Sequence, residues 1–152
     1  MTNPSSWDIV LQLLKDQPLG VLGTNHQKHP YTSLVAFAAT DDARCLYFAT
    51  TRATRKFNNL AEDQQVAFLV DNRSNQKLIF YEAIAVSAYG QAVEVPAEAR
   101  EEALALYLAK HPQLKTFVLS PSTALFQISV ESCHLVQRFQ NVTEFRMDRC
   151  TS

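Results

Sequence analysis

The amino-acid sequence predicts an α+β protein: an antiparallel β-barrel of six to seven strands with two to three peripheral helices. The chain has 152 residues, of which 47% are apolar, so one domain over residues 1–152 can bury a core. Short apolar segments recur along the chain with turn residues between them. Few connections are long enough for the crossovers that parallel strands need, and closing antiparallel strands into a barrel removes exposed edges.

The first third of the chain predicts one helix and then two neighbouring hairpins. Ser5 or Ser6 can cap the helix, and its apolar stripe stops before Pro18. Strands are expected over residues 19–25, 31–39 and 45–50, with turns at 26–30 and 40–44.

The rest of the chain predicts two further helices among longer strands. A short helix over 53–63 buries one apolar face, and the apolar run 65–71 reads as a strand covered on both faces. Gly90 is expected to form a bulge or bend. The remaining expected elements are a strand over 83–95, a helix over 97–111 between two prolines, and strands over 123–139 and 142–147.

The composition of the chain indicates which partners it is expected to bind and in which compartment it is expected to occur. A formal net charge of −1 argues against nucleic acid or an anionic membrane as the main partner. No apolar run approaches the roughly 18 residues of a membrane span, and the N-terminus lacks the basic region of a signal peptide. Cys45, Cys133 and Cys150 lie far apart, so we expect reduced thiols and a cytoplasmic protein.

The stretch from Thr50 to Lys56 gathers three hydroxyls and three cations at the start of a helix. These are Thr50, Thr51, Arg52, Thr54, Arg55 and Lys56. Cations at a helix N-terminus oppose the helix dipole by roughly 0.3–1 kcal/mol each, which suggests that an anion compensates them. Phosphate sites in proteins are built from free helix N–H groups, hydroxyl groups and the charged side chains of Arg and Lys. The alternative interpretation is a solvated basic turn.

Other motifs add little catalytic chemistry. With only three glycines, the chain has neither GxxxxGK[ST] nor GxGxxG. His26 and His29 share a turn without a cysteine or acidic ligand, so no metal site is expected. His111 is placed to favour the end of a helix, and His134 is a strand residue or a candidate haem ligand. No catalytic side chain can be named.

Three stretches carry a family resemblance: "YTSLVAF", "LYFATTRATRKFNNL" and "QVAFLVD". In this order the chain resembles the FMN-binding split-barrel family related to pyridoxamine 5′-phosphate oxidase, over roughly residues 8 to 130. The most specific part is the strand followed by Thr and then Thr-Arg-Lys ahead of a helix. The resemblance implies FMN as cofactor and a homodimer with flavin at the subunit interface.

The resemblance also implies which residues contact the cofactor. The strand backbone at Ser33, Leu34 and Val35 would lie along the isoalloxazine ring. Ala49 and Thr50 would touch the flavin and its phosphate tail, and Thr54, Arg55 and Lys56 would surround the phosphate. Tyr107 and Ser120 would line the pocket more distantly.

The sequence also departs from the full oxidases of this family. Their C-terminal segment, rich in Arg, His and Trp, has no counterpart in "SCHLVQRFQNVTEFRMDRC". The chain therefore resembles the short, general members, and the expected function is a flavin-dependent oxidoreductase or flavin reductase acting on an unidentified small molecule. Two alternatives remain open: a non-catalytic flavin or haem carrier or sensor, with His134 or His29 as haem ligand, and a structural dimer without cofactor.

Overall fold

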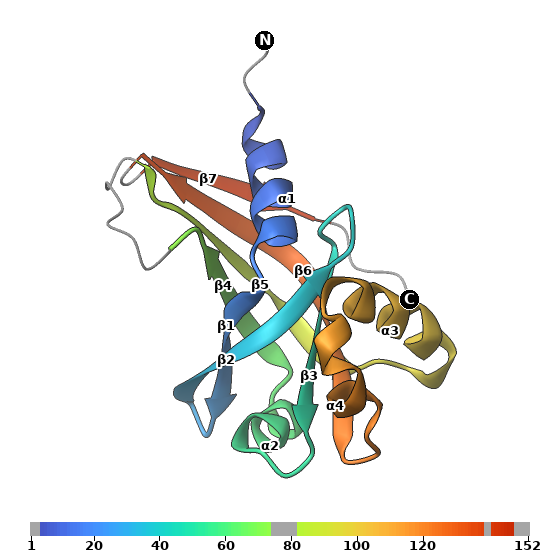
Figure 1. Cartoon of the computed structure of the whole chain (residues 1–152). Helices are drawn as coiled ribbons and strands as arrows, with labels where there is room; N and C mark the ends of the chain where they lie inside the picture. The colour runs from blue at the N-terminus through green and yellow to red at the C-terminus, as the bar shows by residue number, and fades with distance from the viewer. Residues whose placement is uncertain (1–3, 74–81, 139–140, 148–152) are drawn as a thin grey trace.

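The computed structural model describes residues 4–73, 82–138 and 141–147. Within them, seven strands and four α-helices alternate along the chain (Figure 1). In chain order the elements are α1 (Ser6–Asp16), β1 (Leu19–His26), β2 (His29–Ala39), β3 (Cys45–Thr51), α2 (Arg55–Glu62), β4 (Gln65–Asp71), β5 (Ile84–Glu94), α3 (Arg100–Lys110), α4 (Lys115–Leu119), β6 (Thr123–Gln137) and β7 (Asn141–Arg146). Short 3-10 turns, Ala97–Ala99 and Pro112–Leu114, precede α3 and α4.

Six of the strands form a closed antiparallel barrel. The strand order is β3-β2-β1-β4-β5-β6, and β3 also pairs with β6, which closes the ring. The seventh strand, β7, extends the sheet beyond β6 as the second arm of a hairpin. The predicted α+β barrel is therefore confirmed, with the strand count at the upper end of the expected range.

Aromatic residues fill the barrel, and helices close around it. Phe37 and Phe68 meet edge to face with ring centres 5.1 Å apart, and Phe48 stacks on Phe126 at 5.4 Å. All four are buried. The apolar side of α1 joins this core, while α3 and α4 cover the outside of the barrel beside β3 (Figure 1).

Two local signals in the sequence prove accurate. Ser5 caps α1: its hydroxyl accepts from the backbone N–H of Asp8, whose carboxylate accepts in return from the N–H of Ser5. The register of β5 against β6 shifts between Tyr89 and Gly90, as expected for a bulge. A Cβ at Gly90 would clash with the carbonyl oxygen of Ser129, so this position requires glycine.

Three expectations need correction. The helix α4 was not predicted, because Pro112 suggested an end and only five residues follow as α-helix. The strand β4 is not covered on both faces within one chain, since its residues alternate between buried and partly exposed. Cys45 is disulfide-bonded, so the expectation of reduced thiols is wrong for that residue; Cys133 is a free, buried thiol, and Cys150 lies outside the described residues.

None of the helices in the described part of the chain is long and apolar enough to span a bilayer.

Candidate functional site

A groove on the outside of the barrel contains most of the residues singled out from the sequence. It has a volume of about 350 Å³ and lies between β2, β3, the start of α2 and the α3–α4 segment. Its lining consists of Leu34, Val35, Ala36, Ala49, Thr50, Thr51, Thr54, Lys56, Tyr107, Leu114 and Phe117. Lys56 is the only charged side chain among these residues, so none of the described residues that line the groove carries a carboxylate.

The structure brings six of the eight predicted cofactor residues to this groove: Leu34, Val35, Ala49, Thr50, Thr54 and Lys56. Ser33 and Arg55 do not line it. The hydroxyl of Ser33 is buried and has no hydrogen-bond partner among the described residues. The guanidinium of Arg55 lies over the ring of Tyr31, 5.9 Å from its centre.

The hydroxyl of Thr54 builds the start of α2. It accepts from the N–H of Phe57 (3.3 Å), donates to the carbonyl of Thr51 (3.0 Å), and lies 2.9 Å from the hydroxyl of Thr50. This cap leaves the backbone N–H groups of Arg55 and Lys56 without a hydrogen bond inside the described part of the chain. Thr54 thus orients the helix, and the two free N–H groups are donors for an anion.

The three cations of this segment have different surroundings. Arg52 makes two hydrogen bonds to the carboxylate of Glu94, at 2.9 and 2.8 Å, and these bonds lower the pKa of Glu94. The expectation that all three cations need an external anion is therefore wrong for Arg52. Over the residues that the structure describes, Lys56 and Arg55 have no carboxylate partner, which leaves Lys56 as the uncompensated charge at the groove.

Tyr107 supplies a further polar group to the groove. The residue is 1% exposed, and its hydroxyl makes no hydrogen bond within residues 4–73, 82–138 and 141–147. Burial raises the pKa of this phenol to about 12, so it remains a proton-bearing donor at neutral pH. The hydroxyl opens onto the groove, where water or a ligand can accept from it.

Sequence reasoning missed the outer wall of the groove. Leu114 and Phe117 reach it from the 3-10 turn and α4, which were not predicted. Ser120 was expected to line the pocket, but its hydroxyl instead lies 2.9 Å from that of Ser122. The α3–α4 segment lies beside β3 because of tertiary packing, and no local pattern in the sequence predicts this position.

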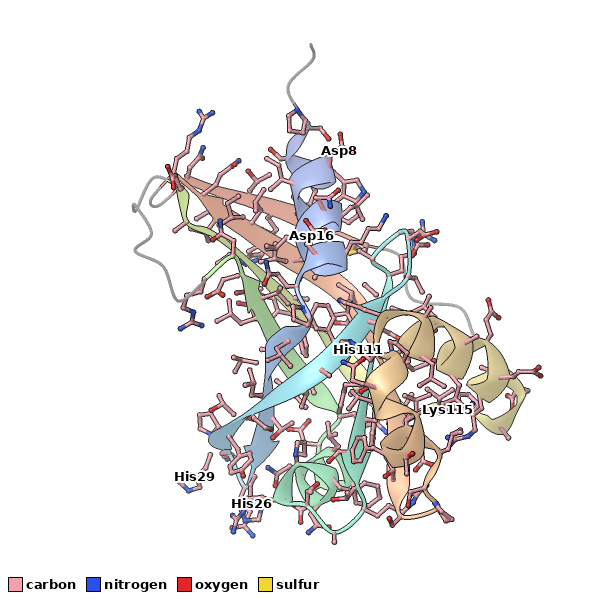
Figure 2. All side chains as sticks on the ribbon, in the orientation of Figure 1. Asp8, Asp16, His26, His29, His111 and Lys115 are labelled. Atoms are coloured by element: carbon pink, nitrogen blue, oxygen red, sulfur yellow. The ribbon has the colours of Figure 1, made fainter. Side chains whose placement is uncertain are left out.

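The histidines lie away from the groove. His29 is exposed at the tip of the β1–β2 hairpin (Figure 2), and His134 lies on β6, 3.9 Å from the carboxylate of Glu144. His111 is buried, and its Nε2 donates to the carbonyl of Phe37 at 2.7 Å. In the described part of the chain, no group of three or more His, Cys, Asp or Glu side chains could hold a metal.

Fold and groove together define a class of protein: a split β-barrel with a phosphate-compatible groove on its outer wall. A family model described as "Pyridoxamine 5'-phosphate oxidase" matches residues 7–137. The chain belongs to the pyridoxamine 5′-phosphate oxidase family, and the resemblance found in the sequence is confirmed. No curated protein gives a significant sequence match.

Solved structures support the same fold. A haem-binding protein from Mycobacterium smegmatis superposes with a TM-score of 0.84 at 15% identity, covering 96% of this chain and 60% of that one. ChuZ from Campylobacter jejuni gives 0.78 at 12% identity, covering 96% and 61%. An FAD-binding protein from Mesorhizobium loti gives 0.68 at 15% identity, covering 87% and 94%. The chain thus spans about 60% of the length of the first two proteins.

Proposed function

We propose that this protein binds FMN in the groove beside α2 and acts as a flavin-dependent oxidoreductase or flavin reductase on a small molecule. The observation that carries the proposal is the uncompensated Lys56 at the groove, next to two free helix N–H groups. An ammonium and two N–H donors match a phosphate monoester, and they would be poorly satisfied without one.

The residues present fit such a cofactor. Lys56 and the N–H groups of Arg55 and Lys56 would hold the phosphate, with Thr50 and the Arg55 side chain close by. Leu34, Val35 and Ala49 would form the wall against the ring. FMN, when bound, supplies the capacity to accept and donate electrons or hydride, and the protein contributes binding, orientation and exclusion of water.

The size of the groove favours a mononucleotide. Its volume of about 350 Å³ lies near the lower end of ligand sites, which span roughly 300–1,000 Å³. Among the described residues, Lys56 is the one cationic side chain that lines the groove, so a second phosphate would have no cationic partner there. None of the four histidines lines the groove, so the groove offers no histidine as an axial ligand for haem.

Titration of the purified apo-protein tests the proposal. We expect FMN to bind more tightly than FAD or riboflavin, and the bound form to show the paired visible bands of a flavin. NADH or NADPH should then bleach these bands if the protein is a reductase. Equal affinity for riboflavin and FMN would contradict the phosphate site, and a Soret band after haem addition without FMN binding would favour the haem carrier.

Tyr107→Phe is expected to separate ligand binding from folding. Because the hydroxyl has no hydrogen-bond partner among the described residues and opens onto the groove, its removal should leave the melting temperature nearly unchanged. Loss of one hydrogen bond to a ligand in the groove should weaken ligand affinity or kcat/KM by roughly 0.5–1.5 kcal/mol. Calorimetric titration and thermal unfolding of the same variant measure the two effects. Unchanged affinity and turnover would show that the ligand does not reach Tyr107.

We further propose that the protein is a homodimer through the outer face of the barrel. The register places Leu34, Val21 and Leu69 in one row across β2, β1 and β4, with Tyr89 in the adjacent row. Leu34 is 65% and Tyr89 40% exposed, and the other two are only partly buried. A contiguous apolar sheet face of this kind commonly marks a protein interface. Leu34 also lines the groove, so a second subunit on this face would adjoin the flavin.

A further inference from the structure

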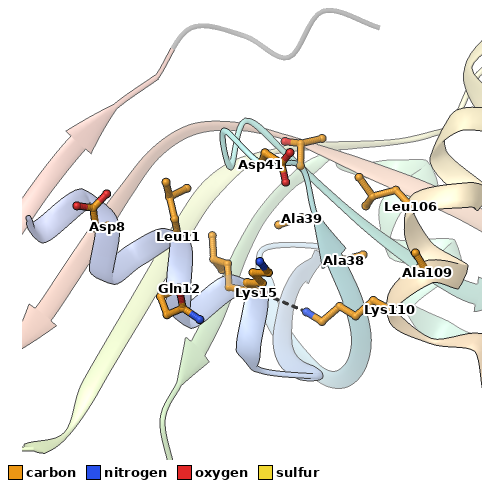
Figure 3. A pocket seen from close by; sticks show the side chains of 12 residues that line it. Asp8, Leu11, Gln12, Lys15, Ala38, Ala39, Asp41, Leu106, Ala109 and Lys110 are labelled. Atoms are coloured by element: carbon orange, nitrogen blue, oxygen red, sulfur yellow. Dashed lines mark hydrogen bonds between the residues drawn. The ribbon is translucent and has the colours of Figure 1, made fainter. Parts of the chain in front are cut away.

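A second cavity, of about 720 Å³, lies between α1 and α3 above the end of β2 (Figure 3). None of its lining residues also lines the flavin groove. The lining consists of Asp8, Leu11, Gln12, Leu14 and Lys15 from α1, Ala38, Ala39, Thr40 and Asp41 from the end of β2 and the turn after it, and Leu106, Ala109 and Lys110 from α3. The cavity therefore combines apolar walls with a few charged groups, as ligand sites do.

Lys110 is the group with the most unusual surroundings. Its Nζ donates to the carbonyl of Leu14 at 2.9 Å and lies 3.9 Å from the centre of the Phe37 ring. Among residues 4–73, 82–138 and 141–147, no carboxylate lies within ion-pair distance of it. Burial lowers the pKa of this ammonium to about 8, and the charge of Asp16 only partly opposes the shift. An ammonium has three donors, and Leu14 occupies one of them.

The acidic groups near this cavity have other roles or lie apart from Lys110. The carboxylate of Asp8 accepts from the N–H of Ser5 in the first turn of α1, and that of Asp16 accepts from Gln12 at 2.7 Å. Asp41 follows β2 on another side of the cavity (Figure 3). His111, which follows Lys110 at the end of α3, donates a hydrogen bond from Nε2 to the carbonyl of Phe37. The second ammonium, Lys15, comes from α1 and is exposed.

We propose that this cavity is a second ligand site and that it binds a small monocarboxylate with an apolar tail. The carboxylate would accept from the free donors of Lys110, with Lys15 at the entrance. The tail would lie against Leu11, Leu106 and the alanines of β2 and α3. An apolar carboxylate satisfies both parts of the lining at once, because it neutralises a partly desolvated ammonium and covers apolar walls. The inference does not depend on flavin binding in the other groove.

Calorimetric titration with octanoate and with its neutral counterpart octanamide tests the site on the unmodified protein. At pH 7 we expect saturable one-to-one binding of octanoate, at least tenfold tighter than binding of octanamide. A group with a pKa of about 8 is mostly charged at pH 7 and about one-tenth charged at pH 9, so octanoate affinity should fall about tenfold between these pH values. An ordinary surface ammonium would cause such a loss only above about pH 10.

A matched pair of variants assigns the effect to Lys110. Lys110→Met keeps the length of the side chain and removes its charge, and it should weaken octanoate binding at least tenfold while octanamide binding changes little. Lys115→Met is the control, because Lys115 is exposed on α4 and lines neither cavity (Figure 2). Equal affinities for octanoate and octanamide, or no loss between pH 7 and 9, would overturn the proposal. Should Lys110→Met fail to fold, the comparison of ligands and pH values on the unmodified protein still decides.

Discussion

Lys56→Met is expected to weaken FMN binding by about 2–3 kcal/mol, or roughly 30- to 150-fold, and to leave riboflavin binding unchanged. Lys56 lines the groove at the second position of α2 and has no carboxylate partner among the described residues. The variant removes one charge-assisted hydrogen bond to a dianion. Riboflavin has no phosphate, so the same change should not affect it. Fluorescence titration of both ligands gives the two affinities.

The neighbouring arginines provide graded controls for this prediction. Arg55 must leave the face of Tyr31 before it can reach a phosphate, so the roughly 0.5–1 kcal/mol of that cation–π contact reduces its net contribution. We expect Arg55→Met to cost about tenfold in FMN affinity. Arg52 is held by Glu94, so Arg52→Met should change FMN affinity little. The order Lys56, Arg55, Arg52 follows from the contacts rather than from charge, which is equal in all three.

The stability of the apo form of Lys56→Met shows whether Lys56 serves a ligand or the fold. Removing the Lys56 charge from the positive end of the α2 dipole should leave the free energy of unfolding unchanged or raise it by about 0.3–1 kcal/mol. If Lys56 were a structural residue, its loss would instead lower the melting temperature. An unchanged FMN affinity in Lys56→Met would rule out the proposed phosphate site at the start of α2.

Local sequence signals predicted the elements that build the groove. The apolar spacing over residues 53–63 predicted α2, and the apolar segments 31–39 and 45–50, with turn residues between them, predicted β2 and β3. Partners far apart in sequence were not predictable: Glu94 is 42 residues from Arg52, and no local rule connects them. The short α4 was missed for another reason: five residues leave too little periodicity to recognise, and their position depends on packing against β6.

The apolar run of β4 is informative because the expectation drawn from it fails within one chain. The run "QVAFLVD" predicts a strand covered on both faces. The structure buries Val66, Phe68 and Val70 in the core and leaves Ala67 and Leu69 partly exposed on the outer face. The apolar residues of this run are therefore more numerous than the core of one chain buries. A second subunit on this face would account for the difference.

Leu69→Arg is accordingly expected to convert the proposed dimer into a folded monomer. A symmetric interface would bury the new charge twice, without a partner, and the cost of about 3 kcal/mol or more would weaken dimerisation at least 100-fold. Within one chain the side chain is only partly buried, so arginine can extend into water and the melting temperature should fall little.

Ala61→Arg is the matched control, because Ala61 is exposed on α2 rather than on the sheet face. Light scattering and sedimentation velocity at several concentrations measure the mass of both variants. FMN affinity should fall in Leu69→Arg alone if the second subunit helps to cover the groove. A dimer of unchanged stability in Leu69→Arg would place the interface elsewhere, and a monomeric parent protein would remove the proposal.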